Sequence, residues 1–181
     1  MIAANNLELK PGTTASNKCD TNADTCCLGK NFVILEYTRR TADVYTYEKS
    51  LKPIKGVPIV NSATAWNEPV TQHTYILVIN EALYYGTKLD HSLINPNQVR
   101  SYGINFWDNP FDKEKGLRIE IDYSVDITMQ TKGTEVYFKT WLPTEVELRY
   151  CPKLQLTSRS ERKPTTASLN NTTTNNREDR P

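Results

Sequence analysis

The apolar residues in the first half of the chain fall into short runs that are separated by polar turn residues. The runs are rich in Val, Ile and Tyr, and they lie at 32–38, 43–48, 57–60, 74–80 and 82–85. None is longer than seven residues, which is short for a helix, and β-branched and aromatic residues favour strands. The pattern therefore predicts a mainly β fold.

One short helix is predicted within "SLINPNQVRSYG", residues 92–103. Asn95 is a suitable N-cap, and Pro96 fits the first helical position, where its missing N–H costs nothing. Gly103 is typical of a residue that ends a helix. This helix interrupts the predicted strands near the middle of the chain.

The second half of the chain returns to alternating apolar and polar positions in "LRIEID", "VDITM" and "EVYFKTWL". This alternation predicts half-buried antiparallel strands. The segment "PTEVELRY" follows, and Thr144 and Glu147 in it have the spacing of a capping box, so a second short helix is predicted there.

The two ends of the chain are predicted to lie outside the core. Residues 1–16 alternate small and polar residues, and we expect a flexible lead-in there. In 157–181 the apolar residues other than proline are Ala167 and Leu169. Such a segment buries too little surface to offset its loss of conformational entropy, so a disordered C-terminal tail is predicted.

The charge and the cysteines exclude several classes of function. Lys and Arg number 22 against 21 Asp and Glu, a net charge of +1, so no nucleic-acid partner is expected. The first ten residues lack the pattern of a signal peptide and no apolar run has the length of a membrane helix, so we expect a cytoplasmic protein without a membrane partner. The four cysteines lack the spacing of a zinc site, so free thiols, no metal and no cofactor are expected.

The chemistry of the chain is concentrated in "DTNADT", residues 20–25. Here an Asp is followed by a hydroxyl residue, a residue that favours turns and a small residue, and the segment lies between predicted strands. The active-site turn of an aspartic protease needs these residue types in this order. The carboxylate must face a second carboxylate across an interface, and the neighbouring hydroxyl must brace the turn at that interface. The motif is short, and a turn or cap carboxylate is the alternative role for Asp20.

A second motif makes the interpretation more specific. The segment "EALYYGTKLDHSLINPNQVRSYGI", residues 81–104, resembles the stretch that follows the active-site turn in copia-type retrotransposon proteases. Residues 83–85 match its first strand, 91–94 its second strand, and Gln98, Val99 and Gly103 its helix and helix stop. "DTNADTCCLGKN" is similar to the active-site turn of some retroelement polyproteins.

The resemblance covers roughly residues 17–125 and implies a domain organisation. It implies a retropepsin-like closed β-barrel with one short helix over those residues, acting as a homodimer. Residues 126–156 match no motif of the family, and we expect a β-hairpin and a short helix as an extension.

The resemblance also implies roles for individual residues. Asp20 would be the catalytic carboxylate and Thr21 the hydroxyl that braces the turn. Asn22, Ala23 and Asp24 would line the cleft and bind the substrate backbone. Two copies of Asp20, sharing one proton across a two-fold axis, would activate a water. The implied activity is cleavage of the element's own polyprotein, in the cytoplasm or in retroelement particles.

A cleft for an extended peptide also needs a lid. We expect a hairpin between about residues 59 and 75 to supply it, with Trp66 at its tip as a substrate-binding residue. The alternative is that Trp66 packs a surface loop.

One position departs from the family pattern. Asn22 stands where retropepsins usually have Gly. Asn visits the left-handed conformation readily, so the turn can form, but its side chain stands where substrate backbone would pass. Two alternatives therefore remain open: a catalytically inactive retroelement remnant, and an unrelated small β-barrel binding module. For Asp24, a structural role within the turn is the alternative.

Overall fold

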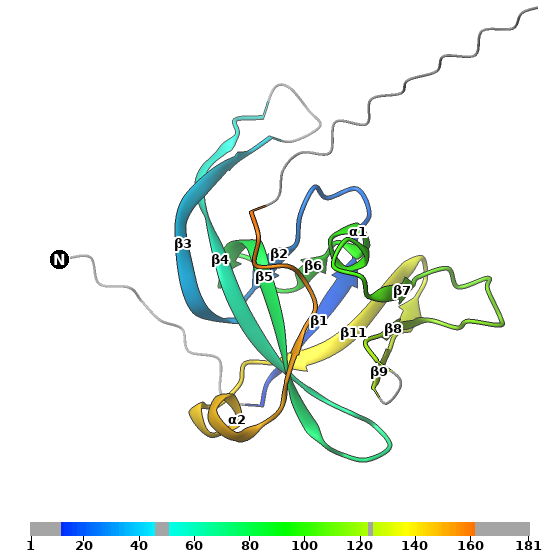
Figure 1. The fold of residues 1–181 in the computed structure, drawn as a ribbon. Helices are drawn as coiled ribbons and strands as arrows, with labels where there is room; N and C mark the ends of the chain where they lie inside the picture. Colours follow the sequence, from blue (N-terminus) through cyan, green and yellow to red (C-terminus); the bar gives the residue numbers. More distant parts are fainter. Residues whose placement is uncertain (1–11, 46–50, 123–124, 162–181) are drawn as a thin grey trace, which may run out of the picture.

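The fold of the computed structural model is mainly β and has two short helices (Figure 1). The structure describes residues 12–45, 51–122 and 125–161. The strands of the larger sheet are β1 (Thr14–Cys19), β2 (Cys27–Gly29), β3 (Val33–Val44), β4 (Ile54–Asn67), β5 (Thr74–Gly86), β6 (Ser92–Ile94), β10 (Gln130–Lys132), β11 (Glu135–Trp141) and β12 (Lys153–Gln155). The smaller sheet contains β7 (Asn105–Trp107), β8 (Arg118–Glu120) and β9 (Asp126–Thr128), and the helices are α1 (Pro96–Arg100) and α2 (Glu145–Tyr150).

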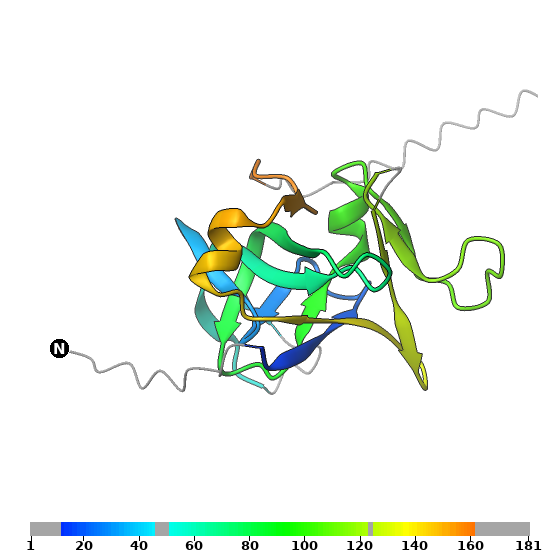
Figure 2. The same cartoon turned by 90° about the horizontal axis from the view of Figure 1, so that it is seen from below.

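The larger sheet closes on itself. Its strand order is β10-β11-β1-β6-β2-β5-β4-β3, and β11 also pairs with β4 where Trp141 faces Ala65. Strand β6 lies between β1 and β2, parallel to the first and antiparallel to the second. The loop that joins β1 to β2 therefore passes the end of β6, where α1 begins. In both views, α2 and the loop between β7 and β8 lie on opposite sides of the molecule (Figure 2).

Two pairs of predicted strands are single strands in the structure. The runs at 32–38 and 43–48 belong to β3, which ends at Val44, and residues 46–48 lie outside the described residues. The runs at 74–80 and 82–85 form β5. Between them Glu81 has a φ of 55° and the pairing with β4 shifts its register. The interruption seen in the sequence is therefore an irregularity inside one long strand.

The predicted boundaries at both ends of the domain are wrong in part. Residues 14–16 belong to β1 and pair with β11, so the lead-in is shorter than predicted. Because β11 pairs with both β1 and β4, residues 135–141 are part of the closed sheet and are not an extension. Thr157 is fully buried, so the predicted tail does not begin there, and residues 162–181 of that tail lie outside the described residues.

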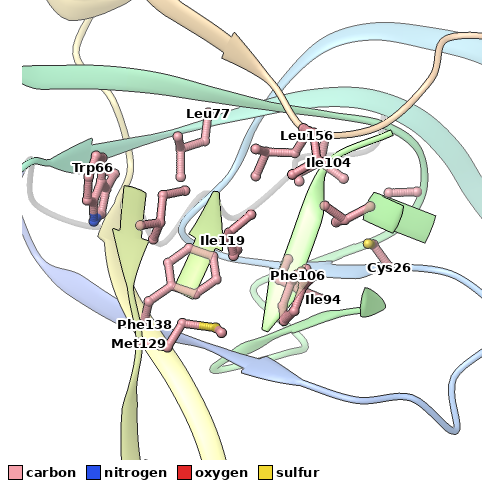
Figure 3. Packing of buried hydrophobic residues seen from close by; sticks show 14 of the residues in the cluster. Cys26, Trp66, Leu77, Ile94, Ile104, Phe106, Ile119, Met129, Phe138 and Leu156 are labelled. Atoms are coloured by element: carbon pink, nitrogen blue, oxygen red, sulfur yellow. The ribbon is translucent and has the colours of Figure 1, made fainter. Parts of the chain in front are cut away.

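The main hydrophobic core lies between the two sheets (Figure 3). Leu77, Ile94, Ile119, Phe138 and Leu156 are at most 3% exposed. Side chains of this kind contribute about 1.5–3 kcal/mol each when they are fully buried. Since they come from β5, β6, β8 and β11 and from the residue that follows β12, the core holds strands of both sheets together.

A second stabilising feature is a buried polar network. The Asn31 side-chain amide donates to Asn17 Oδ1 at 2.9 Å and to Thr140 Oγ1 at 2.8 Å. Asn31 Oδ1 accepts from Ser92 Oγ at 2.8 Å, and Thr140 Oγ1 accepts from Thr64 Oγ1 at 2.7 Å. Buried polar groups are costly unless they are paired in this way. The network therefore favours one register for β1 and β6, the strands on which the candidate site is built.

Both predicted helices are confirmed with their caps. Asn95 Oδ1 accepts from the N–H of Gln98 at 3.0 Å, with Pro96 at the first helical position. Thr144 and Glu147 form the predicted capping box on α2. Among the described residues, no helix has both the length and the apolar character needed to cross a membrane.

We expect Thr144→Ala to lower the free energy of unfolding by about 1 kcal/mol, because the variant loses the hydroxyl that accepts from the Glu147 N–H at 3.2 Å. Equilibrium denaturation in urea would measure the change. Thr144→Ser is the matched control and should differ little from the natural sequence, because it keeps the capping oxygen. Equal losses in the two variants would mean that the cap contributes nothing.

Candidate active site

The predicted catalytic residue begins the loop between β1 and β2. Asp20 is half-buried, and its N–H donates to the Ile94 carbonyl, at the end of β6, at 3.0 Å. Asp20 Oδ1 accepts the N–H of Asn22 at 2.9 Å, the geometry of an Asx turn. In the single chain, the Asp20 carboxylate therefore has the hydrogen bond expected of a carboxylate that stabilises a turn. This bond fixes the orientation of the side chain at the start of the loop.

The other predicted site residues lie on the surface of the same loop. Thr21, Asn22 and Asp24 are exposed and Ala23 is half-buried. Because Thr21 faces solvent, a bracing role for its hydroxyl requires a partner across an interface.

Asn22 does not use the left-handed conformation that made it seem suited to this position. Among the described residues, the non-glycine residues with positive φ are Arg39, Gln72 and Glu81. The turn forms without a left-handed residue at position 22, so the backbone there does not require Gly. Any effect of Asn22 on substrate binding must then come from its side chain.

The first residues of the α1 region hold the far side of the loop. The Asn95 side-chain amide donates to the Ala23 carbonyl, and the Asn95 N–H donates to Cys26 Sγ at 3.3 Å. Asn95 was predicted as an N-cap. In the structure the Asn95 side chain has a second role, because it forms hydrogen bonds to both the helix and the loop.

Gln98 is the residue that sequence reasoning missed. It is 2% exposed, and its Oε1 accepts from the Cys26 N–H at 2.8 Å and from Thr25 Oγ1 at 2.9 Å. Its Nε2 donates to the carbonyls of Asn80 at 3.0 Å and Glu81 at 3.2 Å. Both donors and both acceptor sites of the amide are used. The only signal in the sequence was its match to the family motif, which said nothing of these contacts.

Trp66 is not at the tip of a hairpin, so that prediction is wrong. It lies in β4, is 5% exposed, and its ring packs 6.0 Å from the ring of Tyr75 within the core (Figure 3). Strand β4 continues to Asn67, so position 66 lies inside the strand, and its side chain is buried. The hairpin turn lies beyond it, at 68–73. The alternative role in a surface loop is also wrong, since the side chain packs in the core.

A different hairpin projects from the ring. The outer parts of β3 and β4 and the described residues next to them, 36–45 and 51–58, are called the β3–β4 arm below. In Figure 1 the arm curves away from the ring at the upper left, whereas the loop between β1 and β2 lies near the centre, beside α1. It carries exposed apolar side chains, among them Tyr37, Tyr45 and Ile54. Where exposed apolar side chains form a continuous patch, the patch marks a site that contacts a protein, a membrane or a ligand.

The thiols beside the loop are not suited to nucleophilic chemistry. Burial raises the pKa of Cys19 to about 12, and the charge of Asp108 adds to the effect. Burial, with the charge of Asp20, raises the pKa of Cys27 to about 11. At neutral pH both thiols are protonated and unreactive. Within the described ranges, no group of three His, Cys, Asp or Glu side chains could hold a metal ion.

Comparisons with known proteins give no further assignment. No family model, no curated protein and no solved structure matches the chain.

Proposed function

We propose that the chain is a retropepsin-like aspartic endopeptidase that acts as a homodimer and cuts a retrotransposon polyprotein. One observation supports this above the others. The two motifs of the sequence resemblance are far apart in the chain but lie in direct contact, because residues 94–98 bind both ends of the loop that Asp20 begins. A loop held this firmly at both ends can present a carboxylate in a fixed geometry.

The proposed chemistry requires two copies of the loop. The described residues contain one such turn, so a pair of carboxylates can form only between two chains. Two carboxylates about 3 Å apart share one proton, so that one activates water and the other polarises the scissile carbonyl. The pair titrates as a unit. The exposed Thr21 and Asn22 would lie at the contact between the copies.

The β3–β4 arm is the lid in this proposal, in place of the hairpin that carries Trp66. An extended peptide can pair with a strand edge through its backbone, and apolar side chains on the arm can cover it. The substrate is then a polypeptide in extended form.

Cleavage of a diverse peptide pool by the full chain, from acidic to neutral pH, tests the proposal. We expect the rate per chain to rise with protein concentration and to level off as the dimer forms, because only the dimer carries both carboxylates. Sedimentation over the same concentrations gives the dimer fraction. Cleavage at a constant rate per chain by a monomer would contradict the proposal.

The second candidate is a folded remnant without activity, and the exposed side chain of Asn22 favours it. In that case the natural chain dimerises but cuts nothing, whereas Asn22→Gly, which removes only the side chain from the substrate path, cuts peptides. If neither the natural chain nor Asn22→Gly cuts peptides, an unrelated binding module is favoured.

A further inference from the structure

Glu81 is the most unusual residue of β5. It is 7% exposed and has a φ of 55°, the left-handed region. Residues other than Gly rarely adopt this conformation, and it persists where the surroundings hold it, often at functional sites. Each of its polar groups is bonded, and the partners come from four parts of the fold.

The backbone of Glu81 binds the ring and the Asp20 loop. Its N–H donates to Asn61 Oδ1 on β4 at 3.2 Å. Its carbonyl accepts from Gln98 Nε2 at 3.2 Å and from Thr25 Oγ1 at 3.0 Å, and the one hydroxyl hydrogen of Thr25 is shared with Gln98 Oε1 at 2.9 Å. Thr25 is the last residue of the segment "DTNADT", so one hydrogen bond joins Glu81 to that segment directly.

The carboxylate of Glu81 binds the β3–β4 arm. Arg40 Nη2 donates to its two oxygens at 2.6 and 2.7 Å. Arg40 Nη1 lies 3.5 Å from a carboxylate oxygen of Glu161. Arg39, next to it, has a φ of 64°, and the pairing of β3 with β4 shifts between Tyr37 and Thr41. The ion pair therefore holds the arm at an irregular point in its pairing.

We propose that Glu81 is a positioning residue that couples the β3–β4 arm to the Asp20 loop, through Arg40 on one side and Thr25 on the other. The left-handed backbone turns the carboxylate toward Arg40 while the carbonyl faces Thr25. Without Arg40, a carboxylate that is almost fully buried loses its charged partner, which is strongly unfavourable. Glu81 can relieve this unfavourable burial by leaving the left-handed conformation. Its carbonyl then points in another direction, and the hydrogen bond from Thr25 is lost.

The coupling rests on the proposed function only for the roles of the two segments that it joins, the β3–β4 arm as a lid and the Asp20 loop as the catalytic loop. If the arm covers a peptide and Asp20 cuts it, closure of the arm is transmitted to the loop that carries the carboxylate. The contacts themselves exist in the single chain, so the coupling can be measured without any catalysis.

Hydrogen–deuterium exchange of the full chain tests the inference with Arg40→Gln and its matched control Arg39→Gln. Both variants remove one positive charge from the arm, and Arg39 is exposed. Arg40→Gln should speed exchange about fivefold in peptides covering the arm and the loop at 20–26, the effect of losing about one net hydrogen bond. Arg39→Gln should change neither, and Arg40→Lys should restore part of the protection.

Two further measurements separate coupling from a general loss of stability. Exchange in β11 should stay unchanged in Arg40→Gln. In a Thr25→Val background, which removes the hydroxyl link but keeps the link through Gln98, Arg40→Gln should speed exchange in the arm and have a smaller effect on the loop than in the natural chain. Faster exchange of the arm alone, or an equal increase in every peptide, would overturn the inference. Loss of the coupling and failure to cleave peptides are separate results, since exchange requires no activity.

Discussion

Asp20→Asn should abolish peptide cleavage, with a loss of at least about 1000-fold in kcat/KM. The amide cannot ionise to activate water, and it cannot share a proton with a twin. The turn should survive, because Asn retains the oxygen that accepts the Asn22 N–H at 2.9 Å. The loss is therefore a loss of chemistry, and the melting temperature of the variant should remain close to that of the natural chain.

Asp90→Asn is the matched control for this prediction. It makes the same chemical change on an exposed carboxylate, which pairs with Lys30 at 2.8 Å away from the Asp20 loop. Exposed ion pairs contribute little, so both cleavage and stability should stay near those of the natural chain. Equal losses of cleavage in the two variants would assign the effect to charge in general and would remove Asp20 from the mechanism.

Mixing the natural chain with an excess of Asp20→Asn gives a sharper result. If one catalytic pair needs two Asp20 carboxylates, mixed dimers are inactive, and the excess variant suppresses the activity of the natural chain. If each chain cuts independently, the activity depends only on the amount of natural chain. Such independence would contradict the shared pair even if Asp20→Asn alone were silent.

Local signals explain what the sequence predicted well. The caps of both helices depend on residues three positions apart, Asn95 with Gln98 and Thr144 with Glu147, and these were found. The long strands β3, β4, β5 and β11 were found at least in part from their composition, whereas β1, β2 and β12 were not predicted. What could not be found was pairing over long distances: β6 between β1 and β2, and the closure of the sheet by β11. These contacts leave no mark in any short window of sequence.

The candidate site was predicted in the same uneven way. The residues 20–24 were found as a motif, and the family resemblance linked them to 81–104, but nothing in the sequence indicated which side chains join the two segments. Glu81 had one visible signal, as the charged residue that interrupts the apolar run of β5. Trp66 was misplaced because the end of β4 was predicted too early. The error in the boundary turned a core residue into a surface one.

Gln98→Leu should lower the free energy of unfolding by about 3 kcal/mol. Leu fills a similar volume but forms no hydrogen bond, so the Cys26 N–H and the Asn80 carbonyl lose the bonds that Gln98 makes to them at 2.8 and 3.0 Å. Each buried polar group that loses its partner costs about 1–3 kcal/mol. Thr25 keeps its bond to the Glu81 carbonyl, which limits the loss. Urea denaturation of the full chain would measure it.

Gln130→Leu is the control, because it makes the same substitution at an exposed position of β10. It should change the stability by less than about 0.5 kcal/mol. Equal effects of the two variants would mean that the Gln98 amide gains nothing from its four bonds, and that other contacts hold the loop. If Gln98→Leu is folded without urea but cuts far more slowly than the natural chain, the bonds to Thr25 and Cys26 position the loop as well as stabilise it, because the variant leaves Asp20 itself unchanged.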